Sequence, residues 1–94
     1  MKVKLSVDLG EGPFEVTTNL WVITLWERKF KRLASDMSKG IGIEDMAFWA
    51  YESCKLAQIT VPVVFDEFIK RLESIEVVSE EPENPTQVAP TDTL

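Results

Sequence analysis

The chain has 94 residues, enough for one small domain, and its 45% hydrophobic and 28% charged residues are ordinary values for a globular protein. Its 10 lysines and arginines against 16 aspartates and glutamates give a net charge of −6, which argues against nucleic acid as a partner because that binding depends on cationic side chains. Histidine is absent and Cys54 is the single cysteine, so an internal disulfide and the common Cys/His zinc sites are excluded.

The N-terminal residues lack the long apolar core of a signal peptide. No run approaches the roughly 20 apolar residues that span a bilayer. We therefore expect no membrane partner and a location in the cytoplasm.

Residues 2–18 are predicted to form a β-hairpin. From Lys2 to Leu9 every second residue is apolar, which is the period of a strand with one buried face. A turn rich in glycine and proline follows, and the alternation resumes with Phe14 and Val16. Because a lone hairpin is marginal in water, we expect helices to cover its apolar face.

Three amphipathic helices are predicted after the hairpin. The first covers residues 19–33, with Thr18 or Asn19 as its N-cap. The second covers residues 43–58, and the third begins just beyond Pro62 because proline interrupts a helix. In the first helix, side chains spaced four, four and three residues apart form an apolar stripe, and basic residues occupy the rest of its C-terminal half. The stripe consists of Val22, Trp26, Phe30 and Leu33.

The end of the chain differs in composition from the rest. Residues 79–94 contain three prolines, four acidic residues and no basic residue, and a segment of this kind buries too little apolar surface to order itself. We predict an α+β fold, with one small domain over residues 1–78 and a disordered Pro/Glu-rich tail over residues 79–94.

No set of residues indicates catalysis. Glu44 and Asp45 are adjacent carboxylates, but neighbours on a helix point in different directions, so we expect them to stabilise the helix N-terminus. The glycines at 40 and 42 match no phosphate-binding motif, and Cys54 lies on an apolar helix face, which favours inert packing over a reactive thiolate. We expect no enzyme activity, no cofactor and no metal site.

The aromatic content of the helices exceeds what the narrow stripes use. An apolar stripe is more often core than binding surface, yet Trp21, Leu25, Trp49 and Tyr51 lie outside the stripes. Large aromatic residues left at a surface favour self-association or a partner interface.

Most of the chain resembles the tail assembly chaperones of long-tailed, siphovirus-type bacteriophages. The resemblance rests on an ordered series of segments and on no catalytic motif. Its specific elements are the pair Trp26 and Glu27, the loop and helix entry "GIGIEDMAFWAYE", the turn "FDEFI", and the segment Asn84-Pro85-Thr86.

The resemblance implies an assembly factor without enzyme activity, made in the cytoplasm of the infected bacterium and absent from the mature virion. Such chaperones bind the tape measure protein, keep this long helical chain soluble and promote recruitment of tail tube subunits. In many relatives, ribosomal frameshifting appends a second domain that contacts the tail tube protein, and the present chain would be the short product. We also expect a homo-oligomer.

Combining the resemblance with the surplus of aromatic and basic residues, we predict a partner-binding surface on the first helix and its neighbours. Its predicted residues are Trp21, Trp26, Arg28, Lys29, Phe30, Trp49 and Tyr51. The alternative is a small acidic phage regulator or inhibitor, whose negative charge would occupy a basic site on a host protein.

Overall fold

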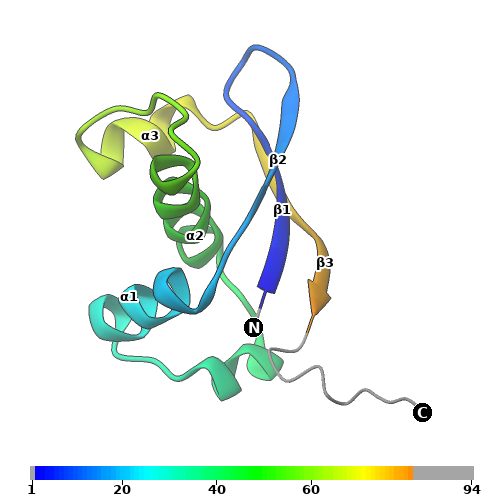
Figure 1. Cartoon of the computed structure of the whole chain (residues 1–94), viewed down its shortest axis with the longest axis vertical. Helices are drawn as coiled ribbons and strands as arrows, with labels where there is room; N and C mark the ends of the chain where they lie inside the picture. Colours follow the sequence, from blue (N-terminus) through cyan, green and yellow to red (C-terminus); the bar gives the residue numbers. More distant parts are fainter. Residues whose placement is uncertain (1, 82–94) are drawn as a thin grey trace.

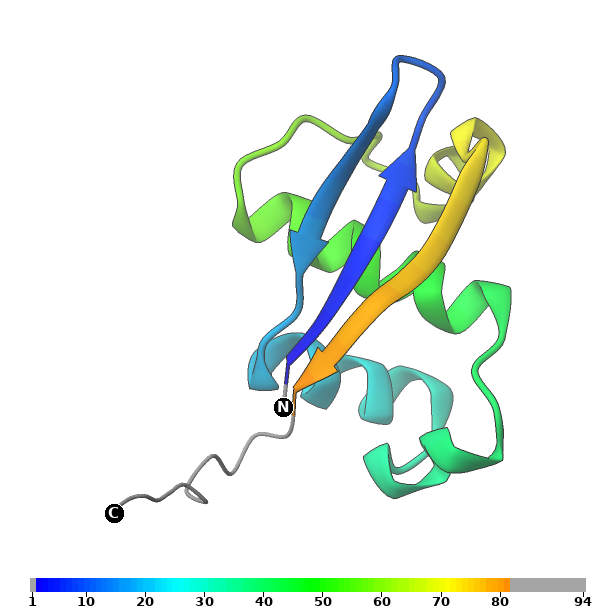
Figure 2. The same ribbon diagram turned by 90° about the vertical axis from the view of Figure 1, so that its right-hand side faces the viewer.

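The computed structural model describes residues 2–81, without the side chains of residues 37–39 and 80–81. It has an α+β fold in which helices cover one face of a small sheet (Figures 1 and 2). The elements in chain order are β1 (Lys2–Asp8), β2 (Pro13–Thr17), α1 (Leu20–Phe30), the 3₁₀ helix η1 (Ala34–Lys39), α2 (Ile43–Leu56), α3 (Phe65–Arg71) and β3 (Ser74–Glu81).

The sheet has three antiparallel strands in the order β2-β1-β3, so the N-terminal strand lies in the middle (Figure 2). Leu5 pairs with Val16 on one side and with Val77 on the other. Its even-numbered neighbours, such as Lys4 and Ser6, lie on the opposite face, which none of the described helices covers (Figure 1). The predicted hairpin and its single apolar face are confirmed.

The core lies between the sheet and the helices, with α2 at its centre. Trp26 of α1 and Trp49 of α2 are fully buried and meet edge to face, with their ring centroids 5.2 Å apart. Phe68 of α3 is also fully buried and packs against Tyr51 at 5.1 Å. Burial of large aromatic side chains is the main favourable contribution to the stability of so small a domain.

Strand β3 was not predicted from the sequence. Residues 74–77 alternate between polar and apolar, and Ile75 and Val77 face the core. The strand occupies the edge of β1 that a hairpin alone would leave unpaired. It also runs to Glu81, past the domain boundary predicted at residue 78. Residues 82–94, the rest of the predicted tail, lie outside the described residues.

Helix α1 is shorter than predicted. It ends at Phe30 because Lys31 adopts left-handed backbone angles, with φ 56° and ψ 42°. The amides beyond it bond to side chains: the Leu33 amide donates to Asp36 and the Ala34 amide to Glu27 Oε2. Leu33 therefore leaves the predicted stripe and is 62% exposed.

Candidate partner-binding surface

Helix α1 is anchored at its start and presents two different faces. Asn19 is the N-cap, and its Oδ1 accepts a hydrogen bond from the Val22 amide at 3.0 Å, which satisfies one of the free amides of the first turn. Val22, Ile23 and Trp26 point into the core. The remaining surface of the helix is directed away from the sheet (Figure 1).

The outward face of α1 combines an aromatic side chain with positive charge. Trp21 is 51% exposed, and Arg28 lies on the same face, two helical turns further on. Lys29 and Lys31 are exposed beside it. Of the carboxylates whose side chains the structure describes, none forms an ion pair with these three cations. We refer to Trp21, Arg28, Lys29 and Lys31 as the α1 surface.

Three of the predicted partner-binding residues lie in the core. Trp26 and Trp49 are fully buried and Tyr51 nearly so. Trp26 and Trp49 pack against each other between α1 and α2, and Tyr51 packs against α3, so in this conformation these side chains offer a partner little surface. Trp21, Arg28 and Lys29 are exposed, as a binding role requires. That they bind a partner stays a prediction.

The burial of Phe30 is intermediate between that of the buried and that of the exposed predicted residues. It is partly buried, and its ring meets that of Phe48 edge to face at 5.5 Å. The ammonium group of Lys29 lies 6.0 Å from the centre of the Phe48 ring, at the outer limit of a cation–π contact. Phe48 and Phe30 thus form an apolar margin beside the α1 surface.

A buried carboxylate fixes the orientation of α1 on α2. Asp45 Oδ1 accepts a hydrogen bond from Trp26 Nε1 at 2.9 Å, while Oδ2 accepts from the Arg32 guanidinium at 2.8 Å and the Gly42 amide at 2.9 Å. The guanidinium also lies over the Trp26 ring, 5.5 Å from its centroid. A buried charge is tolerable when it is paired and fully hydrogen-bonded, and here the bonds also join two helices.

The sequence predicted one part of the role of Asp45. Its position in the first turn of α2 indicated a stabilising carboxylate, and the bond to the Gly42 amide confirms this. The bridge to Trp26 and Arg32 was missed because it depends on how α1 packs against α2. Nothing in the local sequence around Asp45 signals that contact.

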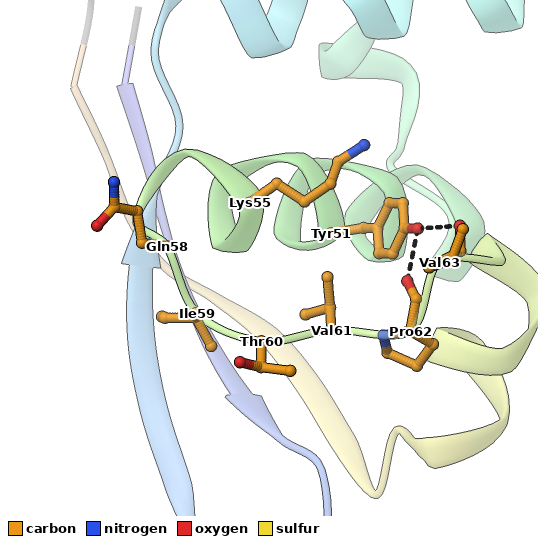
Figure 3. A pocket seen from close by; sticks show the side chains of 8 residues that line it. All are labelled: Tyr51, Lys55, Gln58, Ile59, Thr60, Val61, Pro62 and Val63. Carbon is orange, nitrogen blue, oxygen red and sulfur yellow. Dashed lines mark hydrogen bonds between the residues drawn. The ribbon is translucent and has the colours of Figure 1, made fainter.

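A second surface feature lies at the other end of α2. A hollow of about 450 Å³ opens between α2 and the segment 58–63 (Figure 3). The Tyr51 hydroxyl lies 2.7 Å from the carbonyl oxygens of both Pro62 and Val63, and its single hydrogen can be donated to one of them at a time. Lys55 lies 4.7 Å over the Tyr51 ring, and Val63 is 95% exposed. The sequence analysis did not identify this hollow.

The described residues offer little for catalysis or metal binding. They contain no group of three or more potential metal ligands close together. Cys54 is buried as predicted, and burial raises the pKa of its thiol from 9.0 to about 11, so the nucleophilic thiolate is scarce at neutral pH. The surface features that the described residues do show are an exposed indole, exposed cations and two hollows.

Comparison with protein-family models, with curated proteins and with solved structures gives no significant match. Within residues 2–81, no helix has the length and apolar character needed to cross a bilayer.

Proposed function

We propose that this chain is a tail assembly chaperone of a long-tailed bacteriophage, which binds the tape measure protein and keeps it soluble during tail assembly. The observation that carries the proposal is the α1 surface. An exposed indole at the start of α1 and three exposed cations at its end, none of them in an ion pair with a carboxylate that the structure describes, occur in a chain whose net charge is −6. The resemblance of most of the chain to such chaperones supports the same assignment.

The chemistry of the α1 surface favours an amphipathic helix as its partner. Trp21 offers a large apolar contact with a polar N–H, the side-chain type that dominates binding energy at protein interfaces. Arg28, Lys29 and Lys31 can pair with carboxylates at the margin of that contact and set its orientation. A tape measure helix with apolar and acidic residues on one face would satisfy both groups.

In this proposal the chaperone acts in the cytoplasm of the infected bacterium, as a homo-oligomer, and is absent from the finished virion. A longer form of the chain, made by ribosomal frameshifting, brings the tail tube subunits to the coated tape measure protein. The short form described above supplies the contact with the tape measure protein itself.

Co-expression with the tape measure protein of the same phage tests the proposal. The wild-type chain should yield a soluble complex that contains many copies of the chaperone, as judged by sizing chromatography with mass determination. A triple variant, Trp21→Ala with Arg28→Glu and Lys29→Glu, should leave the tape measure protein insoluble. If the triple variant solubilises the tape measure protein as well as the wild type does, the proposed surface is wrong.

A matched control makes the same changes elsewhere. Val63→Ala with Lys70→Glu and Arg71→Glu also removes one exposed apolar side chain and reverses two exposed cations, on α3 and the segment before it. This variant should keep the tape measure protein soluble. Equal loss of solubility in both variants would show that overall charge, and not the α1 surface, governs the association.

One observation favours the alternative, an acidic regulator or inhibitor of a host protein. The sequence from Glu73 to the end is acidic throughout, without lysine or arginine, as a segment that occupies a basic site would be. If the wild-type chain runs as a monomer and the tape measure protein stays insoluble, this alternative is favoured. Gene order also discriminates, because a chaperone gene should lie directly before a very long tape measure gene.

A further inference from the structure

Strand β3 forms an open edge of the sheet. In the part of the chain that the structure describes, β1 pairs with one side of β3 and no strand pairs with the other (Figure 2). An unpaired edge presents backbone N–H and C=O groups that can pair with an added strand. Between Lys4 and Leu5 of β1 the register shifts and leaves Val78 as an extra residue. Such a bulge bends a strand, so the regular part of the edge is Ser74–Val77.

An apolar hollow lies where the side chains of an added strand would point. It has a volume of about 360 Å³ and is bordered by the start of α2, the end of α3 and the start of β3. Alternate side chains of a strand point to one face of its sheet, so a strand beside β3 would direct every second side chain toward the helices. The lining residues are Ile43, Ile69, Leu72, Glu73, Ser74 and Ile75.

The charge around this edge selects the kind of strand that it accepts. From Glu73 onward the sequence has no lysine or arginine. Glu44 is exposed next to Ile43. On α3, Lys70 is paired with Glu67 at 3.2 Å, and Arg71 is the one exposed cation of this end of the helix without such a pair among the described residues. The carboxylates whose side chains the structure describes beside Ser74–Val77 are Glu73 and Glu76.

This charge argues against a second copy of β3 as the occupant, because two such strands would bring like charges together. A strand with basic residues would instead be attracted to these carboxylates. Electrostatic attraction favours it over an acidic strand of the same shape, and the preference weakens as salt is added.

We propose that the β3 edge binds an extended, basic segment of a partner protein by strand addition at Ser74–Val77, with one apolar side chain of that segment in the hollow beside Ile43. This site is separate from the α1 surface and goes beyond the proposed chaperone function. Backbone hydrogen bonds supply affinity in this mode of recognition, and the hollow and the carboxylates supply selectivity.

Three short synthetic peptides test the proposal. The first alternates threonine and valine and carries lysine at both ends, the second replaces the lysines with glutamate, and the third replaces the central residues of the first with proline. Amide NMR spectra and amide hydrogen exchange of the full chain report where each one binds. The lysine peptide should bind at least about tenfold more tightly than the glutamate peptide, with slowed exchange confined to Ser74–Val77, and the proline peptide should not bind because it cannot donate backbone hydrogen bonds.

Two variants of α2 provide a matched pair. Ile43, at the hollow, is 61% exposed, and Leu56, at the far end of the same helix, is 52% exposed. Ile43→Ser should weaken binding of the lysine peptide by about tenfold through lost apolar contact, while Leu56→Ser should leave it unchanged. Both variants should unfold at the wild-type temperature.

The proposal fails if the lysine peptide does not bind at millimolar concentration, or if the glutamate peptide binds equally well. It also fails if the slowed exchange maps outside β3, or if Leu56→Ser weakens binding as much as Ile43→Ser. The triple variant of the α1 surface should bind the lysine peptide like the wild type. Failure of the chaperone proposal and failure of this one are therefore distinguishable.

Discussion

The inner and outer sides of the helical layer use the same residue types for different purposes. On the inner side, Trp26 is fully buried, donates to Asp45 and lies under the Arg32 guanidinium. On the outer side of the same helix, Trp21 is half exposed near cations that no described acid pairs with. The tryptophan and arginine of the inner side are explained by the fold alone. Those of the outer side are not, and this difference directs the search for a partner to the α1 surface.

The largest expected effect is on the inner side, at Asp45. Asp45→Ala removes the acceptor of the Trp26 indole, the Arg32 guanidinium and the Gly42 amide. We expect the free energy of unfolding, measured by urea denaturation, to fall by about 3 kcal/mol. The neighbouring exposed residue Glu44 provides the control. Glu44→Ala should change the free energy of unfolding by less than about 0.5 kcal/mol. If both variants lowered the free energy of unfolding by a similar amount, the buried carboxylate would be no more important for stability than an exposed one.

On the inner side, Cys54 should make the stability of the chain depend on pH. Burial raises the pKa of this thiol from 9.0 to about 11, so the neutral thiol contributes stability below pH 9 that is lost as the pH rises toward 11. Relative to Cys54→Ala, the wild-type chain should lose about 2 kcal/mol of unfolding free energy across that range. Urea denaturation at a series of pH values measures this difference. Parallel pH profiles for the two chains would contradict it.

Two buried tryptophans provide a finer comparison within the core. Trp26 Nε1 donates to Asp45, whereas Trp49 Nε1 has no hydrogen-bond partner among the residues that the structure describes. Both changes to phenylalanine remove similar volume, but only Trp26→Phe deprives a buried carboxylate of a donor. We expect Trp26→Phe to cost about 1 kcal/mol more unfolding free energy than Trp49→Phe. Equal costs for the two variants in thermal and urea unfolding would show that the Asp45 bond is unimportant.

The smallest effect on stability is expected on the outer side. Trp21→Ala removes a half-exposed side chain, so the free energy of unfolding should change by less than about 0.5 kcal/mol. Its effect on the amount of soluble tape measure protein should be large. A substantial loss of stability without loss of binding would show that Trp21 stabilises the fold, like the residues of the inner side, and does not bind the partner.

The sequence predicted most of the fold because the local patterns are strong. Alternation identified the hairpin, and the apolar spacing around Trp26 identified α1. Strand β3 was missed because only Ile75 and Val77 mark its inner face, and Glu80 and Glu81 give its end the composition of the tail. Its pairing with β1 is a contact across the whole chain, which no local pattern reveals.

The candidate site was predicted less well, for a physical reason. Helical spacing shows which residues share a face, but not which face meets the sheet when one helix is packed on both sides. Helix α2 contacts all three strands, α1 and α3, so Trp49 and Tyr51 are both covered although they point in different directions. Helix α1 packs on one side only. The surplus aromatic residue Trp21 lies on its other side and is exposed, as the binding hypothesis requires.

Lysine acetylation of the chain, free and in complex with the tape measure protein, tests the central claim most directly. The α1 surface contains Lys29 and Lys31, whereas Lys55 and Lys70 lie on α2 and α3 and serve as internal controls. We predict that Lys29 and Lys31 react markedly more slowly in the complex while Lys55 and Lys70 keep their rates. If the complex forms and Lys29 and Lys31 react as fast as in the free chain, the α1 surface does not bind the tape measure protein.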